Sequence, residues 1–473
     1  MLPGDTDLLA LHRCFPDRYP LLLESVADGT PRSRWDLLFV ADGTGFRSNG
    51  AGAVTALDGS MLAGGFFDQL DDQWRVERTR ESIHGALSSR HPVSSEVAAR
   101  DAIQGIASAQ QIPPFHGGWA LYLGYELVGE IEPTLHLPSP DAGVLPTALA
   151  LRCPAALLRD RELGTVIAVA EKGFEALLGA IVDDLDATRD RALPAWTPPV
   201  ALEEDDPRKF LDGVARVHEH LVAGDVFQVN LSRAWRARFA EPLAAGAVYQ
   251  RLRAANPAPF AASLIQPEWA LASSSPERLI SVRDGVVETR PIAGTRPRLA
   301  ADDEAARMKE LIGHPKERAE HVMLIDLERN DLGRVCVPGS IHVDELMSVE
   351  SYSHVHHIVS NVRGRLRDGV TPGEVLRAVF PGGTITGCPK MRTMQIIAEL
   401  EGVGRGAYTG ALGYLNRDGD MDFNILIRTL TLHGDAVRLR AGAGIVIDSI
   451  AERELDETRA KARGLLRACG VSA

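Results

Sequence analysis

The clearest secondary-structure signal lies in residues 408–432, which read Tyr408-Thr-Gly-Ala-Leu-Gly-Tyr-Leu-Asn-Arg-Asp-Gly-Asp-Met-Asp-Phe-Asn-Ile-Leu-Ile-Arg-Thr-Leu-Thr-Leu432. Two strand-forming runs, 408–415 and 422–432, flank the turn Asn416-Arg-Asp-Gly-Asp420. An Asp-Gly pair between such runs favours a β-hairpin, because glycine adopts the positive φ of the turn without steric cost. Arg283-Asp-Gly-Val286 repeats this signal inside the strand-forming stretch 278–290.

The rest of the chain continues this mixture of short strands and helices. Further strands are expected at 226–236, 260–273, 354–366 and 436–448, and helices at 207–223, 302–328, 389–401 and 452–469. Strands outnumber helices and short turns join several of them, which favours antiparallel sheets with helices outside over a doubly wound parallel sheet. The predicted fold class is α+β.

Composition excludes several classes of protein. The 473 residues contain 51 Lys and Arg against 64 Asp and Glu, a net charge of −13, with 45% hydrophobic residues. This negative balance argues against non-specific binding to nucleic acid or to an anionic membrane. Five scattered cysteines without C-x-x-C spacing predict neither a disulfide framework nor a zinc site. Neither a secretory signal nor an apolar run of membrane-spanning length is visible, so a cytoplasmic protein is expected.

A composition shift divides the chain. In residues 191–208, Pro194, Pro198 and Pro199 are followed by an acidic run, which is typical of an extended, solvated crossover. Residues 1–190 precede it as an N-terminal half, and residues 209–473 follow it and hold most of the chemically suggestive motifs. We expect both halves to contribute to one large unit.

Two segments are suited to binding anions. Pro381-Gly-Gly-Thr-Ile-Thr-Gly-Cys-Pro-Lys390 leads into an expected helix, whose N-terminus favours negative charge. It lacks the P-loop pattern, and the alternative is a tight turn without a ligand. Thr289-Arg-Pro-Ile-Ala-Gly-Thr-Arg-Pro-Arg298 gathers three arginines, whose planar forks suit carboxylates, around Thr295. The alternative there is a solvated turn.

Acidic and imidazole groups form a further candidate set. Glu320 and Glu457 lie on two separate expected helices and offer the hard oxygen ligands that Mg²⁺ prefers. The alternative for Glu457 is a surface ion pair with Lys461, four residues later. On the expected strand 354–366, His354 and His356 share one face, whereas His357 points to the other and suits proton transfer or hydrogen bonding.

Taken together, these segments resemble the chorismate-utilising family, which includes anthranilate synthase component I, aminodeoxychorismate synthase component I, and isochorismate and salicylate synthases. The resemblance is dense over residues 207–470 and looser in the N-terminal half, through Leu22-Leu-Glu-Ser25 and Gly117-Gly-Trp-Ala-Leu-Tyr-Leu-Gly-Tyr-Glu126. It implies the anthranilate-synthase-like fold. In that fold two large antiparallel-rich sheets pack face to face with helices outside, in four α/β/β/α layers.

The resemblance also implies a site. Glu320 and Glu457 match ligands of Mg²⁺, which chelates the ring carboxylate of chorismate, and Glu277 matches a general acid for the leaving hydroxyl. His357 and Thr295 match catalytic positions beside that hydroxyl. The groups expected to line the substrate pocket or hold its carboxylates are Gln228, Thr384, Gly387, Tyr414, Arg428, Gly442, Gly444 and Lys461.

Individual residues point to the reaction within the family. Gln228 stands where isochorismate and salicylate synthases carry the lysine base that activates water, so ammonia is the expected nucleophile. Five segments resemble aminodeoxychorismate synthase, among them Pro257-Ala-Pro-Phe260 and Asp422-Phe-Asn424, which implies 4-amino-4-deoxychorismate as product for 4-aminobenzoate and folate synthesis. Ala293 instead resembles anthranilate synthase and argues against a covalent lysine intermediate. The alternatives are anthranilate formation, for tryptophan synthesis, and a non-catalytic sensor of chorismate or tryptophan.

Two partners follow from the same resemblance. The chain has no Gly-x-Cys-x-Gly glutaminase motif, so ammonia is expected from a separate glutamine amidotransferase subunit. Leu22-Leu-Glu-Ser25 resembles a tryptophan-contacting segment, and bound tryptophan is a further possibility.

Overall fold

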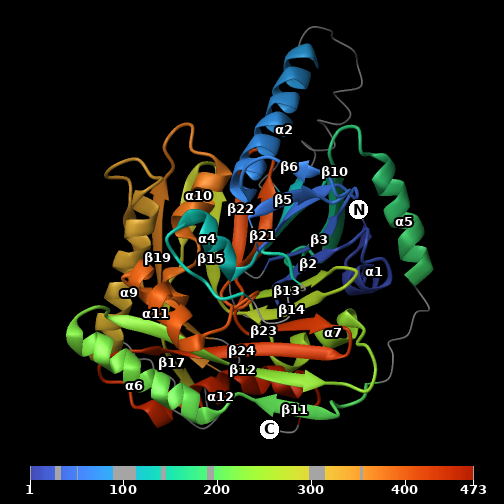
Figure 1. Ribbon diagram of the computed structural model, residues 1–473. Coiled ribbons are helices and arrows are strands. Elements are labelled where there is room, and N and C mark those ends of the chain that lie inside the picture. Colours follow the sequence, from blue (N-terminus) through green and yellow to red (C-terminus); the bar gives the residue numbers. More distant parts are fainter. Residues whose placement is uncertain are drawn as a thin grey trace.

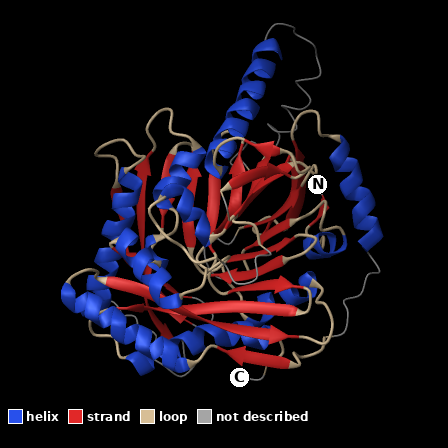
Figure 2. Cartoon of the chain, in the orientation of Figure 1, coloured by secondary structure: helices blue, strands red, loops and turns tan. Residues whose placement is uncertain are grey.

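The computed structural model describes residues 2–26, 34–50, 52–88, 113–139, 145–188, 196–297, 315–351 and 355–471. Its strands form two 12-stranded sheets, and each strand pairs antiparallel with its neighbours (Figures 1 and 2). The predicted class is confirmed, because these sheets and the helices around them form an α+β fold. In the described part of the chain, no helix combines the length and apolar character needed to cross a membrane.

The first sheet joins strands from both halves of the chain. Its order is β1 (Leu2–Pro3), β10 (Thr165–Ala170), β9 (Ala155–Asp160), β3 (Trp35–Val40), β2 (Leu21–Glu24), β13 (Phe260–Ile265), β14 (Ala270–Ser275), β23 (Thr429–His433), β24 (Ala436–Ile445), β12 (Gln228–Arg238) and β11 (Ala201–Glu204), with β20 (Gly387–Cys388) also paired to β12.

The second sheet also mixes the two halves. Its order is β17 (Ile292–Pro297), β19 (Val355–Arg365), β16 (Val286–Thr289), β15 (Arg278–Arg283), β22 (Met421–Ile425), β21 (Ala411–Asn416), β7 (Gly118–Leu123), β8 (Ala148–Cys153), β4 (Gly45–Asn49), β5 (Ala53–Ala56) and β6 (Met61–Leu62), with β18 (His342–Ser351) also paired to β19. Both predicted hairpins form here. Asp284 and Gly285 take positive φ between β15 and β16, as does Gly419 between β21 and β22.

The helices cover the outer faces of the sheets (Figure 1). They are α1 (Leu8–Cys14), α2 (Phe66–Ser88), η1 (Tyr125–Leu127), α4 (Val128–Ile131), α5 (Ala176–Thr188), α6 (Pro207–Ala223), α7 (Ala245–Ala255), α9 (Pro315–Gly333), α10 (Pro372–Val379), η2 (Gly383–Ile385), α11 (Lys390–Glu401) and α12 (Ala451–Ala468). Helix α6 has the predicted bounds, since Asp206 caps its N-terminus and Gly224, with φ 76°, ends it.

The apolar core follows the layers. One cluster lies between the sheets and takes residues such as Phe39 and Leu271 from the first sheet and Tyr122 and Leu412 from the second. Two other clusters join each sheet to its outer helices: α2, α9 and α10 cover the second sheet, and α1, α5, α7 and α12 cover the first. Successive side chains of a strand thus pack alternately between the sheets and against the outer helices, which is the pattern of a sheet buried on both faces.

Three sequence-based boundaries differ from the structure. Residues 201–204, inside the expected solvated crossover, form the edge strand β11, because their backbone pairs with β12 while all four residues stay exposed. The expected strand 260–273 is a hairpin, β13–β14, and the stretch 422–432 is divided between β22 and β23, which belong to different sheets. Residues 302–314 of the expected helix lie outside the described residues.

The chain passes between the two sheets several times, and two of these crossings are adjacent. It leaves β14 for β15 through Pro276 and Glu277, and it returns from β22 to β23 through residues 426–428. The two crossings are hydrogen bonded to each other. The Ile425 amide donates to the Glu277 carbonyl at 3.1 Å, and the Ser274 amide donates to the Arg428 carbonyl at 3.0 Å. The fold therefore brings Glu277 and Arg428 to one place, where the sheets meet.

Candidate active site

Glu277 is a buried acid at the first crossing. Its residue is 7% exposed, and the Thr384 hydroxyl donates to its Oε1 at 2.6 Å. Burial raises the pKa of the Glu277 carboxyl to about 7, while the Thr384 hydrogen bond and the charge of Lys461 act in the opposite direction. A carboxyl with this pKa is partly protonated at neutral pH, so it is suited to general acid catalysis.

Thr384 is held by the glycine-rich segment before α11. It lies in η2, and Gly387 follows in β20, which pairs with β12. Gly387 has φ 132°, and a Cβ there would lie 2.1 Å from the Gln228 carbonyl oxygen. Only glycine fits this close approach. The glycine is thus required by strand packing, and the same packing presents Thr384 to Glu277.

The second crossing contributes positive charge. Arg428 is partly buried, with φ 53°; burial lowers the pKa of its guanidinium, and the charges of Tyr408 and Glu457 oppose that effect. Lys461 Nζ lies 2.6 Å from Glu457 Oε1 and donates to the Gly442 carbonyl at 2.9 Å. The structure therefore brings Arg428, Glu457, Lys461 and Gly442 together, and it also contains the surface ion pair that was the alternative role of Glu457.

Two buried polar atoms on β12, next to β24, lack a hydrogen-bond partner among the described residues. Gly444 and Gly442 of β24 stand opposite Asn230 and Ser232 of β12. A Cβ at Gly444 would lie 2.4 Å from Gln228 Nε2. The Oε1 of Gln228 and the Oδ1 of Asn230 are buried atoms for which the described residues supply no hydrogen-bond partner. Such atoms normally find a partner, so they are available to a polar ligand or water.

The structure places one predicted residue elsewhere. The Tyr414 ring lies in the inter-sheet core, 5.7 Å from the Phe115 ring, and its hydroxyl accepts a hydrogen bond from Arg283 at 2.7 Å. Strand alternation directs it into this layer, away from the Arg428 cluster. Tyr408 takes the position next to the cluster instead, because a Cβ at Gly442 would lie 2.7 Å from its hydroxyl. Nothing in the local sequence pattern distinguishes the two tyrosines.

The proposed metal ligands come from separate helices. Glu320 is partly buried near the start of α9, and Glu457, whose side chain is 48% exposed, is on α12. Within the described ranges, no group of three or more His, Cys, Asp or Glu is placed to hold a metal ion. These carboxylates are hard oxygen donors that fit Mg²⁺ if a ligand and water complete its coordination.

The remaining predicted residues lie on two paired strands. His357 on β19 is partly buried, and Thr295 on β17 is its register partner. The side chains of Thr295, Ala293 and His356 lie outside the described part, as does the whole of His354. The backbone register therefore brings Thr295 and His357 to one place, as expected of two residues of one site.

Comparisons with known proteins agree with this geometry. Residues 66–467 match the model of a family described as chorismate binding enzyme. An anthranilate synthase component I-like protein from Synechocystis is 40% identical over 362 residues, which cover 75% of this chain and 73% of that protein. Aminodeoxychorismate synthase component 1 from Bacillus subtilis is 49% identical over 265 residues, and the match spans 56% of each chain. The crystal structure of anthranilate synthase component I from Streptococcus pneumoniae has a TM-score of 0.76 at 30% identity, over 93% of both chains.

Proposed function

Since the chain belongs to the chorismate-binding enzyme family, we propose that it aminates chorismate to 4-amino-4-deoxychorismate, with ammonia supplied by a separate glutamine amidotransferase subunit. The product is a precursor for 4-aminobenzoate and folate synthesis. The observation that carries amination rather than water addition is Gln228. Its buried carboxamide stands where water-adding relatives are expected to carry a lysine base, and a neutral amide does not activate water.

Glu277 supplies the proton that the reaction consumes. The C–O bond to the leaving hydroxyl breaks as the carboxyl transfers its proton to that oxygen, which departs as water. The lone pair of ammonia forms the new C–N bond, and the resulting ammonium group then releases a proton, so charge and atoms balance. The Thr384 hydroxyl orients the acid at 2.6 Å, and burial keeps its pKa near the pH at which it must both hold and give up a proton.

The second crossing is suited to hold the substrate carboxylates. Arg428 offers a planar fork, and Lys461 lies beside the Gly442 carbonyl, close to the crossing. Magnesium bound by Glu320 and Glu457 would neutralise the ring carboxylate and so favour departure of the hydroxyl. Before that ion binds, Lys461 partly compensates the Glu457 charge.

Anthranilate formation is the second candidate. Ala293, on β17, resembles anthranilate synthases rather than aminodeoxychorismate synthases with a covalent lysine. Of the relatives above, one is named aminodeoxychorismate synthase and two are named for anthranilate synthase component I. Both reactions begin with the same acid, metal ligands and nitrogen nucleophile, so the residues of the two crossings support either outcome.

One product analysis separates the two reactions. Purified protein is incubated with chorismate, Mg²⁺ and ammonium, with and without an aminodeoxychorismate lyase. We expect 4-aminobenzoate only when the lyase is present. Fluorescent anthranilate without the lyase would overturn the first choice in favour of the second. Chorismate binding by calorimetry without turnover would instead support a non-catalytic sensor.

The glutaminase partner and the possible tryptophan ligand need separate tests. Affinity purification from a cell extract should retrieve an amidotransferase subunit, and glutamine-dependent turnover should appear only when that subunit is added. Tryptophan is expected, if it binds, near Glu24, the third residue of the Leu22–Ser25 segment. Glu24 is already bonded to the Tyr249 hydroxyl at 2.8 Å and to Arg253 at 2.9 Å. Calorimetry with tryptophan tests whether that buried network opens to a ligand.

A further inference from the structure

Glu328 is a second buried acid behind the candidate site. It lies on α9 and is 5% exposed. A Cβ at Gly383 would lie 3.7 Å from its Oε1, and Gly383 directly precedes Thr384, the hydrogen-bond partner of Glu277. The turn formed by Gly383 and Thr384 therefore lies between the two carboxyls. Nothing in the reaction proposed above uses Glu328.

A protonated Glu328 would satisfy all the hydrogen bonds around it. Thr289 Oγ1 lies 3.0 Å from Glu328 Oε2 and 3.1 Å from the Leu279 carbonyl oxygen. A threonine hydroxyl has one proton and cannot donate to both acceptors at once. If Glu328 is protonated, it donates to Thr289, and Thr289 donates to Leu279, so both contacts are satisfied. Leu279 lies two residues after Glu277, so this series of hydrogen bonds ends at the start of β15, next to the first crossing.

The charges that face Glu328 come from three places. Burial raises the pKa of its carboxyl to about 8, and the charge of Asp331 on the same helix also raises it, whereas Lys390 on α11 lowers it. A hydrogen bond donated by Thr289 to the ionised carboxylate lowers it as well, and the charge of Glu277 raises it. Glu277 and Glu328 are thus coupled: once one has ionised, the other holds its proton more firmly.

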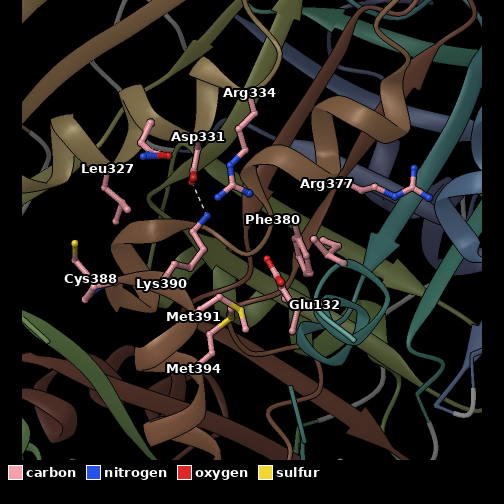
Figure 3. A pocket seen from close by; sticks show the side chains of 14 residues that line it. Glu132, Leu327, Asp331, Arg334, Arg377, Phe380, Cys388, Lys390, Met391 and Met394 are labelled. Atoms are coloured by element: carbon pink, nitrogen blue, oxygen red, sulfur yellow. Dashed lines mark hydrogen bonds and ion pairs between the residues drawn. The ribbon is translucent and has the colours of Figure 1, made fainter. Parts of the chain in front are cut away.

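Asp331 and Lys390 connect this region to a cavity. Lys390 Nζ lies 2.5 Å from Asp331 Oδ2, and both line a cavity of about 300 Å³ between α4, α9, α10 and α11 (Figure 3). The view shows Lys390 reaching from α11 toward Asp331. This ion pair compensates the charge of Asp331, so that Asp331 does not add a full negative charge beside Glu328.

We propose that Glu328 is a positioning residue for the acid Glu277. Glu328 keeps its own proton behind the Gly383–Thr384 turn, so only one of the two buried carboxyls is negatively charged after Glu277 has donated its proton. If Glu328 were ionised, the proton transfer from Glu277 would create a second buried anion, which is strongly unfavourable. Glu328 therefore sets how readily Glu277 gives up its proton. The inference rests on the proposed role of Glu277 as the acid.

The direct test is an infrared pH titration of the protein without substrate, which follows the C=O stretch of protonated carboxyls. Wild type is compared with Glu328→Gln, Glu277→Gln and the control Asp326→Asn, an exposed acid on the same helix. We expect two buried carboxyl bands in wild type and in the control. Each glutamine variant should lose one band. In Glu277→Gln the Glu328 band should disappear at a pH lower by about 0.5–1 unit, because its charged neighbour is gone, whereas in Glu328→Gln, a neutral mimic of the protonated acid, the Glu277 band should keep its midpoint.

The Glu277→Gln protein carries the test of the coupling, and it suffices if Glu328→Gln does not fold. An unchanged Glu328 midpoint in Glu277→Gln would overturn the proposal, as would a lowered Glu277 midpoint in Glu328→Gln, because that would mean that Glu328 is ionised while Glu277 titrates. A wild-type protein with only the Glu277 band would also overturn it.

The kinetic test is the pH dependence of kcat/KM for chorismate consumption at a constant concentration of free ammonia. Glu328→Gln mimics the protonated acid, so it should leave the midpoint of the alkaline loss of activity in place, as should Asp326→Asn. A midpoint moved to lower pH in Glu328→Gln would mean that Glu328 is ionised while Glu277 acts, and would overturn the proposal. Failure of the proposed function is distinguishable, because the wild type would then consume no chorismate while the infrared titration still reports on Glu328.

Discussion

The two adjacent crossings have ionisable groups in opposite surroundings. At the first, Glu277 is buried, faces a hydroxyl, and has a pKa raised to about 7. Beside the second, on α12, the Glu457 side chain is 48% exposed and forms an ion pair with Lys461. The same residue type is therefore suited to proton donation at one end of the site and to charge pairing at the other. Burial makes this difference, because it penalises the charged form of a carboxyl that lacks a close cation.

Lys461 links the two ends. It lies 2.6 Å from Glu457, and its charge also lowers the pKa of Glu277 without reversing the effect of burial. A single cation therefore lies near both carboxylates, but only the exposed one is bonded to it. Changes at either end should alter different kinetic constants, and this allows the comparison to be tested.

The largest effect is expected at the buried end. Glu277→Gln keeps the shape of the side chain but removes the proton, so kcat should fall by about 10²–10⁴-fold with a small change in KM. Steady-state kinetics of chorismate consumption measures both constants. A variant that keeps wild-type kcat would remove Glu277 from the role of acid.

Removal of a metal ligand should come next. Glu320→Ala is expected to reduce Mg²⁺-dependent turnover by at least about 100-fold, because a metal that polarises the leaving group contributes several kcal/mol. A titration with Mg²⁺ should show a weaker apparent affinity. Full turnover at the wild-type Mg²⁺ concentration would contradict the assignment of Glu320.

Stability should depend on pH through the buried acid. The pKa of Glu277 rises from 4.5 to about 7 on folding, so its favourable contribution is complete below the lower value and is lost as pH increases through the upper one. Glu277→Gln cannot ionise. The difference in unfolding free energy, variant minus wild type, should therefore be larger at roughly pH 8 than at roughly pH 5 by about 1–3 kcal/mol. Denaturant titrations of both proteins at the two pH values check this, and a constant difference would contradict it.

The exposed end should affect substrate binding more than stability. Lys461→Met should raise KM for chorismate about tenfold by removing a charged donor, yet change the free energy of unfolding by less than about 0.5 kcal/mol. The control is Arg459→Met, which removes an exposed cation of the same helix bonded to Glu204. Equal KM values for the two variants would mean that Lys461 is only a surface ion-pair partner.

The smallest effect compares two tyrosines. Tyr408→Phe should raise KM for chorismate a few-fold, because its hydroxyl lies beside Gly442. Tyr414→Phe should leave both kinetic constants unchanged and destabilise the fold by about 1 kcal/mol through loss of the Arg283 hydrogen bond. Parallel kinetics and denaturant titrations measure both effects. The reverse ranking would restore the original assignment of Tyr414.

Much of the secondary structure could be predicted because its signals are local. The Asp-Gly turn at 284–285 and the Asp206 cap and Gly224 end of α6 act on the residues next to them in the chain. The strand β11 was missed because its four exposed residues carry no apolar alternation; only the pairing with β12 makes them a strand. The place of Tyr414 could not be predicted for a related reason, since the layer that each face of β21 meets is built from distant segments.

The sequence by itself determined the fold class, the helices and hairpins with strong end signals, and the family, together with Glu277 as the candidate acid. Only the tertiary structure decided which of these groups titrates near neutral pH. Thr384 reaches Glu277 from 107 positions away, and Thr289 meets Glu328 across 39. A pKa depends on burial and on charges in space, and neither is specified by neighbours along the chain. For the same reason Glu328 is indistinguishable in the sequence from the exposed acids around it, although in the folded protein it is a second buried acid behind the site.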